Sequence, residues 1–298
     1  MASARRVEGG DRDRLEPQRL LLAWFRANGP RYPWRETEHD PYAVLVSEVM
    51  LQQTQASRVA EAFPAFMERF PDADTLAVAS RAEALRAWGG LGYARRAAAL
   101  QEAARSIVRE HGGEVPSDGE SLMALPGIGP YTASAVASIA FGVPAAAVDT
   151  NVRKVISRLA FGAEPDEVPA PDVAAAATRW LSHEAPGDWN QAVMDLGRDV
   201  CRPIPRCDVC PIATACRFRA GGRVPRRSDR RQPAFEGSMR QARGGVLREL
   251  RGRDRAATIR GIAAALGFPV LRVDLAVDAL ERDGLVERTG SGRLRLAR

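Results

Sequence analysis

The segment from residue 125 to 152, LPGIGPYTASAVASIAFGVPAAAVDTNV, strongly restricts what this 298-residue chain can fold into. It opens with a short turn in which Gly127 and Gly129 lie between two prolines. Glycine is favoured where φ must be positive or where the backbone approaches another group closely. The small residues that follow predict a helix whose free N–H groups can bind phosphate. Asp149 follows an apolar run, and one alternative for it is the N-cap of the next helix.

The composition predicts an all-α protein. Hydrophobic residues make up 45% of the sequence and aromatic residues 6%, with long alanine-rich periodic stretches. A chain of this length can form two or three domains with cores of their own. No apolar run reaches the length of a membrane span, and the charged N-terminus lacks the apolar core of a signal peptide. We therefore expect a protein of the cytoplasm that associates with the nucleoid.

The positive charge is concentrated at the C-terminal end. From residue 217 onward the chain holds 20 arginines and 9 acidic residues, a balance of +11, whereas the first 216 residues have a balance of −5. An excess of positive charge attracts polyanions and supplies most of the nonspecific affinity for DNA. The sequence thus predicts that the last quarter of the chain contributes to DNA binding.

One carboxyl group stands in an apolar helix. Asp40 and Pro41 predict a helix start, and the helix that follows carries Glu48 with apolar residues three and four positions away on its face. Such surroundings disfavour the charged carboxylate and favour the protonated acid. The alternative places Glu48 on a polar stripe beside Ser47 and Gln52, and the periodicity alone does not decide between them.

All four cysteines lie in one short segment and predict a metal centre. Their spacing is C-x5-C-x2-C-x5-C, and disulfide frameworks instead scatter cysteines through a secreted chain. Thiolates suit an iron–sulfur cluster or a zinc ion alike. The four candidate ligands are Cys201, Cys207, Cys210 and Cys216.

Together these features resemble the helix-hairpin-helix DNA glycosylases that carry an iron–sulfur cluster, and within them the adenine-excising, MutY-type enzymes. The string SEVMLQQTQ at residues 47–55 is closely similar to those enzymes, and the likeness extends over residues 15–218. The resemblance implies that Glu48 and Asp149 are catalytic. It also implies a [4Fe-4S] cluster on the four cysteines, although the first gap is one residue shorter than the usual C-x6-C.

The resemblance further assigns residues that contact DNA. Gln52 and Gln53 would enter the DNA helix, and Tyr93 of the loop GLGY would wedge beside the lesion base. Gly127 and Gly129 would belong to the hairpin that holds the DNA backbone. The alternative for Tyr93 is an aromatic that anchors its own loop, and Ala94 follows where the family usually has a second tyrosine.

Tyr131 occupies a position that separates two kinds of glycosylase. Relatives that also cut the DNA backbone carry a nucleophilic lysine there, and a phenol cannot form a Schiff base. The resemblance therefore implies a monofunctional enzyme in which Tyr131 belongs to the catalytic site. The alternative is an aromatic at the helix start that only packs.

The sequence predicts the following division of the chain. Residues 1–14 form a disordered N-terminus, and residues 15–218 a two-lobed glycosylase core. Within the core, residues 29–145 mainly form a six-helix lobe with its hairpin at 121–141, while 15–28 and 146–218 form the iron–sulfur lobe. Residues 219–235 are a basic linker, and residues 236–298, three helices and a hairpin, resemble a winged-helix module.

The resulting hypothesis is a monomeric enzyme that removes adenine mispaired with guanine or 8-oxoguanine from double-stranded DNA, with the target base flipped out. One alternative keeps the fold but changes the substrate to mismatched thymine or uracil. A second alternative is a non-catalytic, iron–sulfur DNA-binding regulator. The C-terminal Nudix-like domain common in adenine glycosylases is not expected in a chain of this length.

Overall fold

The computed structural model describes residues 12–37, 39–225 and 234–298, and the chain divides into two compact units. The first unit comprises Met1–Val44, Ser117–Met123 and Gly129–Arg230. The second unit comprises Leu45–Pro116, Ala124–Ile128 and Arg231–Arg298. Most of the predicted disordered N-terminus and the centre of the predicted basic linker lie outside the described residues, so both stay predictions.

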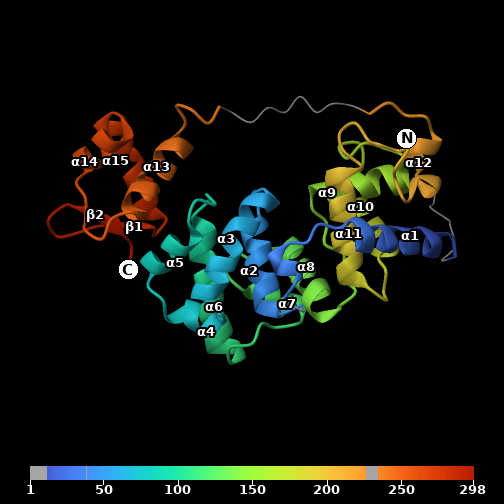
Figure 1. Ribbon diagram of the computed structural model, residues 1–298, viewed down its shortest axis with the longest axis horizontal. Coiled ribbons are helices and arrows are strands. Elements are labelled where there is room, and N and C mark those ends of the chain that lie inside the picture. The colour runs from blue at the N-terminus through green and yellow to red at the C-terminus, as the bar shows by residue number, and fades with distance from the viewer. Residues whose placement is uncertain (1–11, 38, 226–233) are drawn as a thin grey trace. The chain divides into compact units, whose positions relative to one another are not determined.

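Helices make up nearly all of the regular structure in the described ranges, which confirms the all-α prediction (Figure 1). The α-helices are α1 Arg12–Asn28, α2 Pro41–Leu51, α3 Ala56–Arg69, α4 Ala73–Val78, α5 Arg81–Trp88, α6 Arg95–His111, α7 Gly119–Ala124, α8 Pro130–Phe141, α9 Thr150–Ile156, α10 Ala170–Trp180, α11 Pro186–Asp199, α12 Arg217–Ala220, α13 Met239–Arg251, α14 Ile259–Leu266 and α15 Val270–Arg282. Strands β1 Val286–Arg288 and β2 Leu294–Leu296 pair antiparallel. None of these helices is both long and apolar enough to cross a membrane.

Local capping signals set where several helices begin. The Asp40 carboxylate accepts a hydrogen bond from the Tyr42 N–H at the start of α2, where Pro41 takes the first helical position. Ser80 and Glu83 form a reciprocal capping box at the start of α5. These helix starts follow from a few neighbouring residues, which is why the sequence indicates the first of them.

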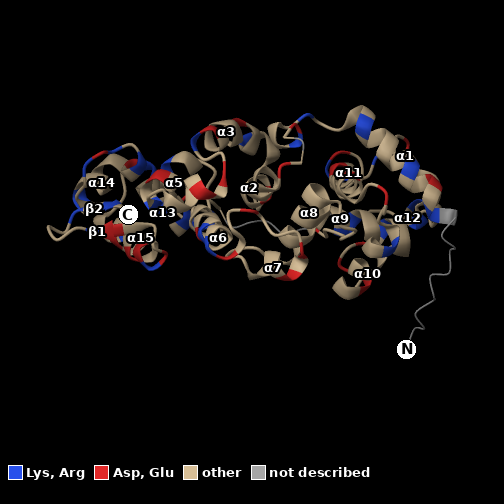
Figure 2. Cartoon of the chain, turned by 90° about the horizontal axis from the view of Figure 1, so that it is seen from below, with Lys and Arg blue, Asp and Glu red and all other residues tan. Residues whose placement is uncertain are grey.

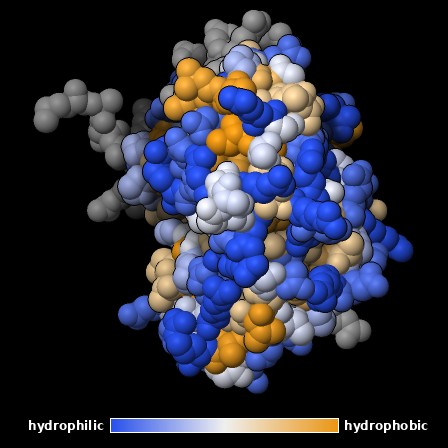
Figure 3. Space-filling model, turned by 90° about the vertical axis from the view of Figure 1, so that its left-hand side faces the viewer, coloured by the Kyte–Doolittle hydropathy of each residue, from blue (hydrophilic) through white to orange (hydrophobic). Residues whose placement is uncertain are grey.

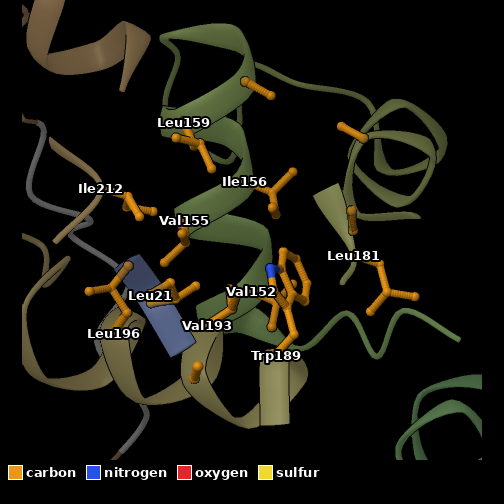
Figure 4. Packing of buried hydrophobic residues seen from close by; sticks show 14 of the residues in the cluster. Leu21, Val152, Val155, Ile156, Leu159, Leu181, Trp189, Val193, Leu196 and Ile212 are labelled. Carbon is orange, nitrogen blue, oxygen red and sulfur yellow. The ribbon is translucent and has the colours of Figure 1, made fainter. Parts of the chain in front are cut away.

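An apolar core in the first unit brings together α1, α9, α10 and α11 (Figure 4). Trp189 and Val193 of α11 pack with Val152 and Ile156 of α9, and Leu21 of α1 joins the same cluster. Burying one such side chain contributes about 1.5–3 kcal/mol. This core therefore fixes the position of α9, whose N-cap is Asp149.

A buried amide fixes the segment that leads to Asp149. Asn190 of α11 is fully buried, and its Nδ2 donates to Ser138 Oγ at 2.9 Å and to the Ala145 carbonyl at 2.8 Å. Its Oδ1 accepts from the Ala147 N–H at 3.0 Å. The residues between α8 and α9 form no helix or strand, so Asn190 supplies hydrogen bonds that the backbone there cannot make with itself.

The second unit contains α3–α6 and the C-terminal module. Trp88 of α5 is buried and meets the edge of the Phe66 ring with centroids 6.1 Å apart. In the module, α13, α14 and α15 precede the β1–β2 hairpin, in the order predicted from the sequence. The module's buried side chains include Val246, Ile262 and Val273. Its likeness to winged-helix modules stays a prediction.

We predict that Asn190→Ala destabilises the protein by about 2–4 kcal/mol, because it leaves buried polar groups of the chain without partners. Thermal and urea unfolding measure this loss. Asn28, an exposed residue at the end of α1, is the matched control, and Asn28→Ala should change stability by no more than about 0.5 kcal/mol. Equal losses in the two variants would contradict the role given to Asn190.

Candidate functional site

Glu48 lies in α2, a deeply buried helix. Residues 42–50 of α2 are all buried, and Glu48 is only 5% exposed. Ser47 is equally buried, so the alternative of a solvent-facing polar stripe is wrong. Burial of a carboxyl group among apolar side chains favours its protonated form. The arrangement therefore suits an acid that donates a proton inside the protein.

The two predicted DNA-contacting segments of the second unit share an unusual backbone conformation. Outside glycine, the described residues with positive φ are His39, Gln53 (55°) and Tyr93 (45°). Gln53 is exposed just beyond the end of α2, and Tyr93 is 48% exposed in the loop before α6. Left-handed backbone at residues other than glycine costs free energy and is concentrated at functional sites. Both side chains are therefore exposed on segments with an unfavourable backbone conformation.

Arg96 joins these two segments, and the sequence analysis did not identify it. Its guanidinium donates to the carbonyls of Val49 and Met50 at 2.8 Å each, and to Thr54 Oγ1 at 2.9 Å. It also donates to the Gly92 carbonyl at 3.2 Å, on the loop that carries Tyr93. One side chain thus caps the C-terminal end of α2 and holds the loop before α6.

The environment of Arg96 is partly apolar. The guanidinium lies 5.2 Å from the Trp88 ring centroid and 5.4 Å from that of Tyr93, and burial lowers the pKa of Arg96 to about 10. A sequence signal for this role existed: Arg95 and Arg96 occupy the first turn of α6. Cations are disfavoured at a helix N-terminus, so arginines there indicate specific partners elsewhere.

The hairpin between α7 and α8 contains the two predicted glycines. Gly127 has φ of +79°, and a Cβ there would approach Ala99 Cβ to 2.7 Å, so only glycine fits. Gly129 is the N-cap of α8, and a Cβ built on it meets nothing within 4 Å. The start of α8 is therefore open, as a phosphate-binding helix terminus requires. Gly127 and Gln52 also line one pocket, so the structure brings these two predicted residues together.

Tyr131 lies in the first turn of α8 and is partly buried. Its hydroxyl donates a weak hydrogen bond to the Met194 sulfur at 3.7 Å. This contact anchors the ring against α11, which agrees with the packing alternative. A contribution of Tyr131 to the catalytic site stays a prediction.

Asp149 is the N-cap of α9, so the structural alternative predicted for it is correct. Its Oδ1 accepts from the Val152 N–H at 2.6 Å, and its Oδ2 accepts from the Asn151 amide at 3.1 Å. Asn151 in turn accepts from Lys154 Nζ at 3.3 Å. Burial raises the pKa of the Asp149 carboxyl, while these hydrogen bonds oppose the rise. Capping does not preclude catalysis, since it holds an anion at a fixed position.

The four cysteines line a single pocket, together with Arg158, Val200 and Pro205 among other residues. None of the four forms a disulfide, all are partly exposed, and burial raises the pKa of Cys210 to about 12. The Arg158 guanidinium approaches Cys201 Sγ at 3.6 Å and forms a buried ion pair with Glu164. Among the described residues no three potential ligands are gathered closely enough to hold a metal ion. Four thiols are a suitable set of ligands for a metal, but in the described structure their side chains do not converge on a common point.

The predicted site residues fall in both compact units. Glu48, Gln52, Gln53, Tyr93 and Gly127 belong to the second unit, and the first unit holds Gly129, Tyr131, Asp149 and the four cysteines. Within the second unit Arg96 joins the segments of Gln53 and Tyr93. Within the first unit the cysteines share a pocket, and Asp149 is linked to Lys154 through Asn151.

Comparisons with known proteins agree on one family. Residues 46–180 match the HhH-GPD superfamily of base excision DNA repair proteins. The chain is 42% identical over 282 residues to the adenine DNA glycosylase of Mycobacterium tuberculosis, covering 93% of this chain and 92% of that one. It is 43% identical over 210 residues to the human adenine DNA glycosylase, covering 67% of this chain and 38% of the human protein.

Solved structures share the fold. A thermostable thymine-DNA glycosylase is 28% identical with a TM-score of 0.65, and the match covers 71% of this chain and 98% of that one. A complex of endonuclease III with DNA matches with 24% identity and a TM-score of 0.60, covering 72% of this chain and 99% of that one. Both matches leave more than a quarter of this chain uncovered.

We predict that Asp149→Asn makes the protein more stable than the wild type at neutral pH. Because burial raises the pKa of Asp149 in the folded state, the wild type loses stability as pH rises from the unfolded value of about 3.9 through the folded value, and the asparagine does not. Thermal unfolding from pH 4 to neutral pH should therefore show a gap in Tm that widens with pH. A gap that stays constant, or a variant that is less stable at neutral pH, would contradict the effect of burial.

Proposed function

The chain belongs to the HhH-GPD superfamily of base excision DNA repair proteins, and within it to the adenine DNA glycosylases; on that premise we propose that it hydrolyses adenine from mismatches with guanine or 8-oxoguanine. The observation that carries this proposal is the burial of Glu48 in α2, within the region that matches the superfamily. Asp149 lies in the same matched region. The sequence thus supplies two carboxyl groups in different surroundings.

The chemistry follows from those surroundings. Cleavage of the bond between C1′ and N9 needs a better leaving group and stabilisation of an oxocarbenium-like sugar. In this proposal Glu48, buried in an apolar helix, donates a proton to the purine ring, and the Asp149 carboxylate stabilises the sugar cation. Water then adds at C1′ and gives one proton to the Glu48 carboxylate, which restores the acid. Hydrogen bonds from Val152 and Asn151 fix the Asp149 carboxylate and support its anionic form.

Access to the base requires that it leave the DNA stack. We infer that Gln52, Gln53 and Tyr93 fill the space that the flipped nucleotide leaves. The positive φ of Gln53 and Tyr93 and the hydrogen bonds of Arg96 support this, because they hold both segments before DNA arrives. The open helix start after Gly129 is suited to a backbone phosphate.

Tyr131 supports hydrolysis without strand cleavage. It stands at the start of α8, at the position where strand-cleaving relatives carry the lysine nucleophile. Without an amine there, no Schiff base forms, and the product is an abasic site in an intact strand. We therefore propose a monofunctional enzyme.

The cofactor proposal is a [4Fe-4S] cluster held by the four cysteines. The thiol set around one pocket supports it, and Arg158 beside Cys201 would donate a hydrogen bond to a ligand sulfur. Bound, the cluster would supply a structural crosslink of the segment from 201 to 216. The purified protein should be brown and contain iron and acid-labile sulfide, whereas a colourless, active protein with one zinc ion would overturn the assignment.

A thymine or uracil glycosylase is the second candidate, favoured by the likeness to the thermostable thymine-DNA glycosylase. The higher identity to adenine glycosylases over nearly the whole chain favours adenine. Glu48 and Asp149 both lie in the region that matches the superfamily, and their joint presence weighs against a non-catalytic regulator. We infer that the enzyme acts as a monomer on double-stranded DNA of the nucleoid, and sedimentation of the free and DNA-bound protein tests the monomer.

One assay separates these functions. Labelled duplexes carrying adenine, thymine or uracil opposite guanine or 8-oxoguanine are incubated with the protein and then treated with alkali. We expect cleavage after alkali only for the adenine strands, and no cleavage without alkali. Cleavage of the thymine or uracil strands alone would favour the second candidate, and cleavage without alkali would show that Tyr131 does not preclude strand scission.

A further inference from the structure

The C-terminal module contains a helix pair of the helix-turn-helix kind. Helix α14 ends at Gly267, which adopts the left-handed conformation, and α15 begins after Pro269. In DNA-binding modules of this kind the second helix enters the major groove, and its N-terminal residues contact the base edges. The exposed residues at the start of α15 therefore decide whether the module can read DNA in this way.

The exposed residues at the start of α15, Val270 and Leu271, are apolar, and other apolar residues of this helix are buried. Val273, Ala276, Val277 and Leu280 are buried and pack into the module. The opposite side of α15 is exposed, with Leu271 at 71% and Leu275 at 51%. Apolar side chains are also seen among hydrophilic ones on the side of the molecule drawn in Figure 3. Leucine gains little in a groove lined by polar base edges.

The charged side chains on this side of α15 are three carboxylates, the exposed Arg282 and Arg288 of β1, which leaves a small excess of negative charge. Arg288 of β1 binds Asp278 at 2.7 Å, Glu281 at 2.9 Å and Asp274 at 3.1 Å, so one guanidinium faces three carboxylates. Acidic positions on the module are red in Figure 2. The described part of the module has 13 arginines and 8 acidic residues, so this face has the opposite sign to the module as a whole. A local excess of carboxylates repels DNA phosphates.

We propose that Val270, Leu271, Asp274, Leu275 and Asp278, the α15 face, bind a segment of a partner protein that carries apolar residues at helical spacing flanked by lysine or arginine. Apolar side chains of such a segment would cover the leucines, and its cations would pair with the carboxylates. A second copy of the chain fits poorly, because an isologous contact brings the carboxylates of both copies together. The proposal concerns recruitment and does not depend on which base the enzyme removes.

The α15 face is small, so the contact is expected to be weak. Only a few apolar side chains are available, and interfaces of this size are transient. The side chains are exposed in the described structure, and their replacement therefore leaves the core of the module intact. This allows the surface to be changed without unfolding the protein.

The test uses the full chain and a fluorescent peptide of about 15 residues with leucines three and four apart and lysines between them. Fluorescence anisotropy should give a Kd of roughly 10–100 µM. Leu271→Ser with Leu275→Ser should weaken binding by about tenfold or more. Asp274→Asn with Asp278→Asn, which keeps both leucines, should also weaken it. A peptide with glutamate in place of lysine should not bind.

The matched control is Val78→Ser on α4, since Val78 is 86% exposed in the same unit but lies outside the α15 face. It should bind the peptide as the wild type does. Unchanged peptide binding by the leucine variant would overturn the proposal. A loss of affinity for undamaged duplex in that variant would instead identify a DNA surface, and conversion of a dimer to a monomer would identify a second copy; either result would also overturn it.

Discussion

The guanidinium of Arg96 organises the part of the second unit that carries the proposed DNA contacts. It bonds the last carbonyls of α2, the Thr54 hydroxyl and the loop that carries Tyr93, and it lies against the Trp88 ring. These acceptors offset the cost of taking a half-buried cation partly out of water. The strained turn at Gln53 and the loop at Tyr93 are therefore held together by one side chain. Glu48 lies one turn before that end of α2, so the same bonds also fix the helix that carries the proposed acid.

Features that depend on neighbouring residues were predictable from the sequence. The start of α2 at Asp40 and Pro41, the hairpin around Gly127 and the order of elements in the C-terminal module all follow from local signals. The roles of Arg96 and Asn190 were not predictable in this way. Apart from Gly92, their partners lie about 40 to 50 positions away along the chain, and only the fold brings them within hydrogen-bond distance. The family resemblance identified candidate residues but not the contacts that hold them.

Two properties of the C-terminal quarter now need separate explanations. Its overall positive charge still suits nonspecific DNA binding, which the sequence predicts. The exposed face of α15 has leucines and carboxylates instead, so the charge is divided between different surfaces. A module that holds DNA with some arginines and a protein with α15 would link the glycosylase to another factor at the same site. The similarity to the mycobacterial enzyme extends over this quarter as well.

Proton donation by Glu48 is the step on which the proposed mechanism depends. It is tested most directly by the single-turnover excision of adenine and of 7-deazaadenine, which lacks the ring nitrogen at position 7, from otherwise identical duplexes. The wild type should excise 7-deazaadenine roughly 10²–10⁴-fold more slowly than adenine, because this is the usual contribution of a general acid. Equal rates for the two bases would contradict proton donation to the nitrogen at position 7, whatever the place of Glu48 in the structure.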